Sequence, residues 1–134
     1  MGKFSIIAIA VGVVFSSGAM AELPMSKDMY KAEKNRIEGE YKAEKARCDS
    51  LAGNVKDICL AEAKGREEVA KASLEAQYEP SRENRYEARA AKLEADYAVA
   101  KERCDDKAGN AKDICVKEAK AAEAAAKANA KRVD

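Results

Sequence analysis

The sequence predicts an all-α protein made of two tandem helical hairpins, each closed by a disulfide bond. Three observations predict this fold: a composition dominated by helix-forming residues, an internal duplication, and four cysteines placed symmetrically about two Gly-Asn pairs. Charged residues make up 37% of the 134 residues and aromatic residues only 5%. This usage is typical of long helices, which can bury narrow contact lines between them but not a thick globular core.

The start of the chain, residues 1–21, has the three parts of a secretion signal. Lys3 supplies the positive charge, Phe4–Phe15 is an apolar run, and Ala19–Ala21 has the A-x-A pattern of a cleavage site. The apolar run is shorter than the roughly 20 residues that a membrane-spanning helix needs, so we expect no retained membrane anchor. The sequence predicts a cleaved signal peptide over residues 1–21, a mature chain starting at Glu22, and a periplasmic location.

Removal of the signal leaves a chain without net charge. The full sequence has 25 basic and 24 acidic residues and no histidine; the signal contains one of the basic residues, Lys3, and no acidic one. A neutral chain with densely mixed charges has no bias toward nucleic acid or an anionic membrane. We therefore expect no nucleic-acid partner.

The mature chain is an internal duplication. Pro24–Tyr78 aligns without gaps with Pro80–Asp134, and 23 of the 55 aligned positions are identical. The best-matched stretch, R-C-D-x-x-A-G-N-x-K-D-I-C, occurs at Arg47–Cys59 and again at Arg103–Cys115. Self-similarity at a fixed period is typical of repeat architectures, so we assign residues 22–79 to helical repeat 1 and residues 80–134 to helical repeat 2.

Each repeat has apolar residues at helical spacing. In the first segment of each repeat they recur at positions i, i+7, i+11 and i+18, which places them on one line along a helix. The second segment has a leaner line of small residues, so large side chains on one helix should face small ones on the other. The lines are Tyr30, Ile37, Tyr41 and Cys48 facing Val55, Cys59, Ala63 and Ala70, and then Tyr86, Leu93, Tyr97 and Cys104 facing Ala111, Cys115, Ala119 and Ala126. The tyrosines are predicted to be core residues and not ligand-binding ones.

The Gly-Asn pairs predict the turn inside each hairpin. Gly53 can adopt the left-handed conformation that ends many helices, and Asn54 is a favourable residue to cap the next helix. Asp57 would then lie near that helix's positive N-terminal end. Gly109 and Asn110 repeat the arrangement.

Two disulfide arrangements are compatible with this spacing. Chain reversal at Gly-Asn would bring Cys48 to Cys59 and Cys104 to Cys115, because each pair is symmetric about its turn. Alternatively, each repeat forms one long helix, and an antiparallel coiled-coil pair is joined by Cys48–Cys115 and Cys59–Cys104. The local hairpins are favoured, because a glycine inside a helix costs about 1 kcal/mol. Four cysteines in an exported chain indicate structural disulfides in either case.

Catalytic and cofactor-binding patterns are not found in the sequence. Without histidine no Ser-His-Asp set is possible, and the cysteine spacing matches neither zinc sites nor C-x-x-C redox motifs. Carboxylates alternate with basic residues at helical spacing, as in Glu62/Arg66 and Glu67/Lys71, and indicate an ion-paired, solvated surface. We therefore predict a protein that is not an enzyme and has no catalytic, cofactor-binding or metal-binding residues and no cofactor.

The duplicated run Y-x₆-C-D-x-x-A-G-N-x-K-D-I-C-x-x-E-A-K resembles small exported Ala/Lys/Glu-rich proteins of Gram-negative bacteria. That resemblance covers both repeats and implies a cell-envelope protein. Similarity to TolA is compositional only, in stretches such as Glu118–Lys131. The same stretches resemble late-embryogenesis-abundant stress proteins, which implies a hydrophilic protectant, although that family has few cysteines.

Three functional hypotheses follow from these features. The first is a periplasmic envelope-interaction or stress-response protein that contacts an envelope protein, or associates with itself, through the contact lines of its helices. The second is a soluble, hydrophilic stress protectant. The third is a metal-responsive or redox-responsive carrier.

Overall fold

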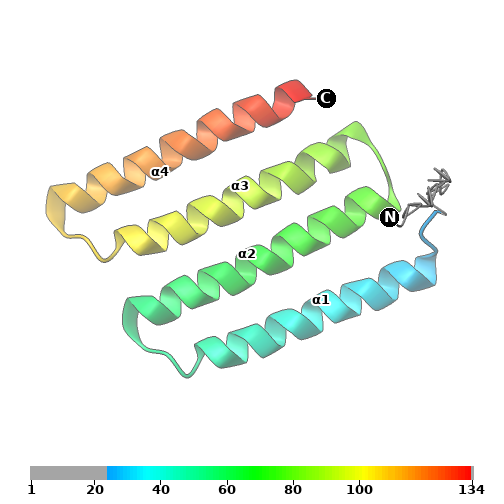
Figure 1. Cartoon of the computed structure of the whole chain (residues 1–134), viewed down its shortest axis with the longest axis horizontal. Helices are drawn as coiled ribbons and strands as arrows, with labels where there is room; N and C mark the ends of the chain where they lie inside the picture. Colours follow the sequence, from blue (N-terminus) through cyan, green and yellow to red (C-terminus); the bar gives the residue numbers. More distant parts are fainter. Residues whose placement is uncertain (1–23, 134) are drawn as a thin grey trace, which may run out of the picture.

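The computed structural model describes residues 24–133, which form four α-helices and a short 3₁₀ helix (Figure 1). Their bounds are α1 Lys27–Cys48, α2 Gly53–Tyr78, α3 Arg82–Cys104, α4 Gly109–Ala130 and η1 Lys131–Val133. The predicted signal peptide and the mature N-terminus at Glu22 lie outside the described residues. None of the described helices is long and apolar enough to cross a membrane.

The helices form two antiparallel hairpins, α1–α2 and α3–α4, so the predicted all-α tandem hairpin fold is confirmed (Figure 1). The chain leaves the helical path after Cys48 and Cys104 and re-enters it at Gly53 and Gly109. The alternative with one long helix per repeat is therefore wrong. The two glycines have φ values of +59° and +54°, a conformation that side chains with a Cβ disfavour.

The prediction that Asn54 caps α2 is wrong. The helix begins one residue earlier, at Gly53, and Ala52 holds the N-cap position in an extended conformation without a side-chain hydrogen bond. The Asn54 side chain lies in the first turn and instead donates hydrogen bonds toward the end of α3. The same holds for α4, where Ala108 and not Asn110 is the N-cap. Serines cap α1 and α3: Ser26 accepts from the Met29 N–H, and Ser81 from the Asn84 N–H.

The four helices lie side by side in a single layer (Figure 1). Each helix packs on the one before and after it in the chain, and the α2–α3 contact between the repeats is the most extensive. Helices α1 and α4 form the opposite edges of the layer. Burial follows this order, because an inner helix has neighbours on two sides: α2 and α3 contribute seven of the ten buried residues, α1 two and α4 one. They are Ala63, Gly65, Glu67, Leu74, Ala90, Ala95 and Cys104, then Ile37 and Cys48, then Ala130.

Candidate functional site: a hollow across the four helices

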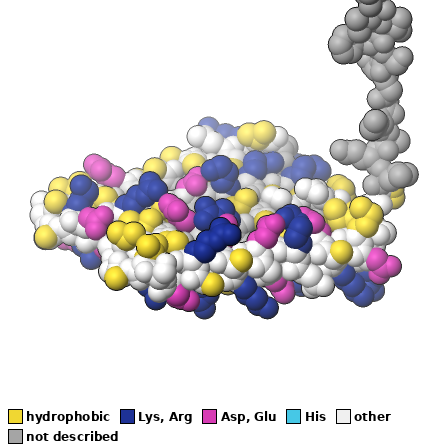
Figure 2. All heavy atoms as spheres, turned by 60° about the horizontal axis from the view of Figure 1, so that its bottom comes forward, with side chains coloured by type: hydrophobic (Ala, Val, Ile, Leu, Met, Phe, Trp, Pro, Cys, Tyr) yellow, Lys and Arg dark blue, Asp and Glu magenta, His cyan; other side chains and the backbone are white. Residues whose placement is uncertain are grey.

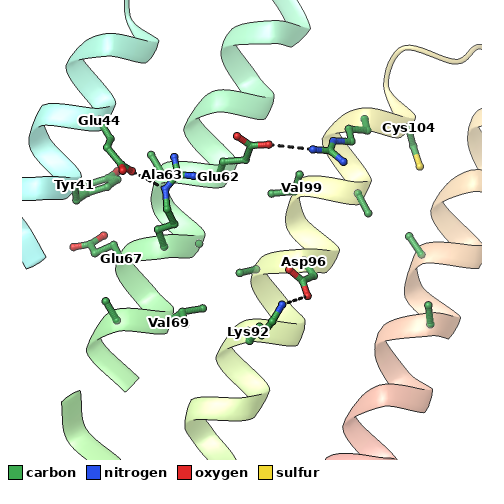
Figure 3. A pocket seen from close by; sticks show the side chains of 18 of the residues that line it. Tyr41, Glu44, Glu62, Ala63, Glu67, Val69, Lys92, Asp96, Val99 and Cys104 are labelled. Atoms are coloured by element: carbon green, nitrogen blue, oxygen red, sulfur yellow. Dashed lines mark hydrogen bonds and ion pairs between the residues drawn. The ribbon is translucent and has the colours of Figure 1, made fainter. Parts of the chain in front are cut away.

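One face of the helical layer is hollowed, and the hollow has a volume of about 1220 Å³. All four helices contribute to its lining (Figure 3). Small and branched apolar side chains make up much of the surface: Ile37, Ala63, Val69, Ala95, Val99 and Ala119. Charged side chains from the same helices lie among them.

A close approach of α2 and α3 forms the middle of the hollow. Gly65 of α2 lies directly against Ala95 of α3, and a Cβ added to Gly65 would lie 2.7 Å from the Ala95 Cβ. Real Cβ atoms essentially never come that close. The glycine therefore permits the short distance between the two helices, and the neighbouring small residues leave open space in place of packed side chains.

Two ion pairs between helices border the hollow. Arg66 of α2 donates to Glu44 of α1 at 2.9 Å, and Arg103 of α3 donates to Glu62 of α2 at 3.1 Å. Figure 3 shows both pairs reaching between adjacent helices. At the places in repeat 2 that correspond to Glu44 and Arg66, the chain has Ala100 and Ala122. The α3–α4 half of the hollow therefore lacks this pair.

Glu67 is the one buried charged residue among those described. It is 7% exposed and accepts hydrogen bonds from Lys71 at 2.7 Å and from Lys64 at 3.0 Å. Burial alone would raise the pKa of the Glu67 carboxyl, but the two ammonium groups outweigh it and hold this pKa below its ordinary value.

The predicted ion pairs along α2 are partly confirmed. Glu67 and Lys71 form the expected pair. Glu62 and Arg66 do not pair with each other, because each faces an oppositely charged side chain on a different neighbouring helix, α3 and α1 respectively.

The four cysteines form the two local disulfides, Cys48–Cys59 and Cys104–Cys115, as the hairpin model predicts. The Cα atoms are 5.6 Å and 5.7 Å apart, within the usual range for disulfides. The second disulfide contributes to the hollow, since both of its cysteines line it. No thiol remains free within residues 24–133, and this part of the chain has no group of three or more His, Cys, Asp or Glu residues that could hold a metal.

The prediction that the tyrosines are core residues is only partly confirmed, because all five are half-buried and Tyr41 lines the hollow. The Tyr30 ring stacks on Tyr78 with 4.4 Å between centroids, and the Tyr30 hydroxyl donates to Glu75 at 2.7 Å. The ammonium of Lys64 lies 5.5 Å from the Tyr41 ring centroid. Two residues of the predicted apolar lines, at corresponding places in the repeats, do not pack: Val55, which is 63% exposed, and Ala111.

Sequence reasoning did not find the hollow. Val99 and Ala95 lie on the face of α3 away from its tyrosine and cysteine line, and Val69 lies to one side of the corresponding line of α2. One signal could have pointed to them: Gly65 in the interior of a helix, where a glycine costs about 1 kcal/mol relative to alanine, indicates a close approach to another helix.

Comparison with known proteins gives no relative that would assign a function. No protein-family model matches the chain, no curated protein matches it, and no solved structure matches it.

Proposed function

We propose that this chain is an exported, non-enzymatic binding protein of the cell envelope that holds an amphipathic helical segment of a partner protein in its hollow. One observation carries the proposal: all four helices line one hollow with small apolar residues and charges of both signs. Amphipathic helices commonly bind by laying their apolar face into a groove of this kind.

The dimensions of the hollow suit a helix better than a small molecule. Its volume of about 1220 Å³ is above the range of about 300–1,000 Å³ typical of small-molecule sites. Neighbouring helix axes lie about 8–10 Å apart, so a segment crossing four helices spans roughly 24–30 Å. A helix with a rise of about 1.5 Å per residue covers that distance with about 16–20 residues.

The lining favours an amphipathic partner. Its alanines offer little steric resistance, so a partner's apolar side chains can approach the backbone of α2 to α4. The acidic Glu40 and Asp96 and the basic Lys92 also line the hollow and can pair with a partner's polar face, in place of the Lys92–Asp96 pair of the single chain. The charges give specificity more than affinity.

The proposed compartment is the periplasm. Two disulfides are typical of oxidising compartments, and the sequence predicts a cleaved signal over residues 1–21. We expect mass spectrometry of periplasmic protein to find Glu22 as the first residue. Recovery of the chain with Met1 in the membrane fraction would contradict this location.

The other two hypotheses have less support. A hydrophilic protectant of the late-embryogenesis-abundant type should be largely disordered in dilute solution, whereas this chain forms four packed helices joined by disulfides. A thiolate metal carrier needs reduced cysteines. We therefore propose neither.

The helix-binding proposal can be tested by placing larger, charged side chains in the α3–α4 half of the hollow. The double variant Ala100→Glu/Ala122→Arg places in repeat 2 the pair that Glu44 and Arg66 form in repeat 1. A photo-crosslinking amino acid at Glu40, which lines the hollow, reports contact with a partner in intact cells. We expect a discrete crosslinked species with the native chain and its loss with the double variant.

The matched control is Ala124→Glu, which lies on α4 outside the hollow and corresponds to the exposed Glu68 of repeat 1. It should leave the crosslink unchanged. Equal crosslinking by the native chain and the double variant, with circular dichroism showing both folded, would overturn the proposal.

A further inference from the structure

The contact between α2 and α3 joins repeat 1 to repeat 2. Because the two repeats align, the residues on each side of this contact have counterparts elsewhere in the chain. The face of α2 that meets α3 has a counterpart on α4, at the same place in repeat 2. The face of α3 that meets α2 has a counterpart on α1, at the same place in repeat 1. These two counterparts, which we call the outer α4 face and the outer α1 face, lie at opposite edges of the layer (Figure 1). They cannot meet within one chain.

Three contacts characterise the α2–α3 interface. Glu62 accepts from Arg103 at 3.1 Å. The Asn54 amide donates to the Glu102 carbonyl at 2.9 Å and to Asp106 Oδ1 at 2.7 Å. The third is the approach of Gly65 to Ala95.

The ion pair has a complete counterpart on the outer faces. Glu62 corresponds to Glu118 on α4, and Arg103 corresponds to Arg47 on α1, so both charges are retained. Neither side chain has an ion-pair partner among residues 24–133. Each outer face therefore presents the charge that the other one requires.

The asparagine contact has a counterpart as well. Asn54 corresponds to Asn110 at the start of α4, and its two acceptors correspond to the backbone carbonyl of Ala46 and the hydroxyl of Ser50 on α1. Both groups accept hydrogen bonds. A second copy of α1 would therefore offer Asn110 a backbone carbonyl, as Asn54 has, and a neutral hydroxyl in place of the Asp106 carboxylate.

The close approach shows the most specific correspondence. Gly65 corresponds to Ala121, and Ala95 corresponds to Gly39, so the glycine and the alanine exchange sides. Two alanines would collide at the α2–α3 distance, because the added Cβ would come within 2.7 Å of its neighbour. One glycine facing one alanine is retained, and Gly39 has open space around it in the single chain.

An exposed isoleucine marks the same surface. Ile114 on the outer α4 face is 47% exposed, whereas its counterpart Ile58 is half-buried on the α3-facing side of α2. Figure 2, with the α1 edge of the layer turned forward, shows basic and acidic side chains interleaved with apolar ones. Such a surface has no dominant charge of one sign that would repel another copy.

We propose that chains of this protein associate head to tail, with the outer α4 face of one chain packed antiparallel on the outer α1 face of the next. The new contact repeats the α2–α3 contact, with Glu118, Asn110 and Ala121 of one chain against Arg47, Ser50 and Gly39 of the other. The association is heterologous, so each added chain leaves the same two faces open. The single layer thereby extends as a solenoid does, by repeated nearest-neighbour contacts.

The first experiment is sedimentation velocity of the oxidised full mature chain at rising concentration. Within one chain the corresponding contact benefits from a short linker, which supplies an effective concentration in the millimolar range. The series therefore extends to about 1 mM, and we expect the mean mass to rise without a plateau at the dimer. A monomer at every concentration would overturn the proposal.

Charge reversal tests the register. Arg47→Glu and Glu118→Lys should each reduce association at least tenfold, and the double variant should restore it. Lys45→Glu, with the same charge change in the same last turn of α1 but away from the proposed contact, should associate like the native chain. Association that the double variant does not restore, or that Lys45→Glu weakens equally, would overturn the proposed register.

A glycine variant separates association from folding. Gly39→Ala has room in the single chain but would place an alanine against Ala121 of the next. We expect a higher unfolding midpoint at low concentration together with weaker association, and Gly39→Ala/Ala121→Gly should recover the association. Unchanged association of Gly39→Ala would contradict the proposed close contact.

Discussion

The two hairpins have the same turn and the same disulfide, but different residues hold their helices together away from the disulfide. In repeat 1, Tyr30 stacks on Tyr78 and bonds to Glu75, and Arg66 reaches Glu44. In repeat 2, the contacts at corresponding places are the Lys131 ammonium over the Tyr86 ring, 5.6 Å from its centroid, and two alanines.

Other contacts are shared by the two hairpins. Lys71 pairs with Glu67 and Glu38, and Lys127 pairs with Glu123 and Glu94. The turns also match, with Lys56–Asp49 and Lys112–Asp105 across them. The comparison shows that the duplicated motif maintains the turn, the disulfide and one ion-pair cluster. The tyrosine stack at the open end and the Arg66–Glu44 pair nearer the disulfide have no counterpart in repeat 2. Repeat 2 should therefore depend more on its disulfide.

The largest expected effect comes from removing the disulfides one at a time. Cys48→Ser/Cys59→Ser and Cys104→Ser/Cys115→Ser each open a loop whose closure contributes about 3 kcal/mol in the chain-entropy model. We expect loss of the second disulfide to free α4, which has only one buried residue, while α1 stays attached through Tyr30 and Glu44. Hydrogen exchange resolved by peptide measures this difference. Equal protection of α1 and α4 after the two changes would contradict the comparison.

The next largest effect is the change in stability when a helix glycine, Gly65 or Gly39, is replaced by alanine. Gly65→Ala should destabilise by about 1–2 kcal/mol, because overpacking costs about 1–3 kcal/mol and the better helix propensity of alanine returns up to about 1 kcal/mol. At low concentration Gly39→Ala should stabilise by about 0.5–1 kcal/mol, since nothing lies within 4 Å of the new Cβ. Urea denaturation measures both changes. Gly65→Ala/Ala95→Gly is the control and should recover much of the lost stability.

A smaller effect is expected from pH. The pKa of Glu67 is lower in the folded chain than its ordinary value of 4.5, so its ionised form stabilises the fold above that value. This contribution is lost as pH falls through the folded pKa. Because Lys64 and Lys71 are half-exposed, we expect about 1 kcal/mol or less. Glu67→Gln should flatten stability against pH below about 4.5. A stability profile of this variant against pH that matches that of the native chain would contradict the role of the buried carboxylate.

The smallest effect should come from Tyr30→Phe. It removes the hydroxyl that donates to Glu75 and keeps the ring that stacks on Tyr78. Thermal unfolding followed by circular dichroism should show a slightly lower midpoint. Tyr86→Phe is the matched change in repeat 2 and should leave the midpoint unaltered, because the Tyr86 contact is made by its ring.

Much of the fold could be predicted because it depends on local signals. The spacing of Tyr30, Ile37, Tyr41 and Cys48 specifies one apolar helix face, and Gly53 specifies where the chain can reverse. Together they favour Cys48 beside Cys59, although the same spacing is also compatible with Cys48 beside Cys115 in a pair of long helices. The same reasoning failed for Asn54, since its side-chain partners, Glu102 and Asp106, lie far along the chain in the other repeat.

The sequence by itself determined the helices and the turn regions and favoured the local pairing of the cysteines, because each depends on residues within about one hairpin of each other. The structure excluded the cross-repeat pairing. Only the tertiary structure decided that the hairpins lie in a single layer, that Gly65 meets Ala95, and that a hollow results. The periodicity of the sequence identifies the apolar face of each helix. It does not identify which neighbouring helix packs on the opposite face, because that depends on how closely two backbones can approach. That distance depends on pairs of small side chains far apart in the sequence, and becomes visible only when the helices are packed.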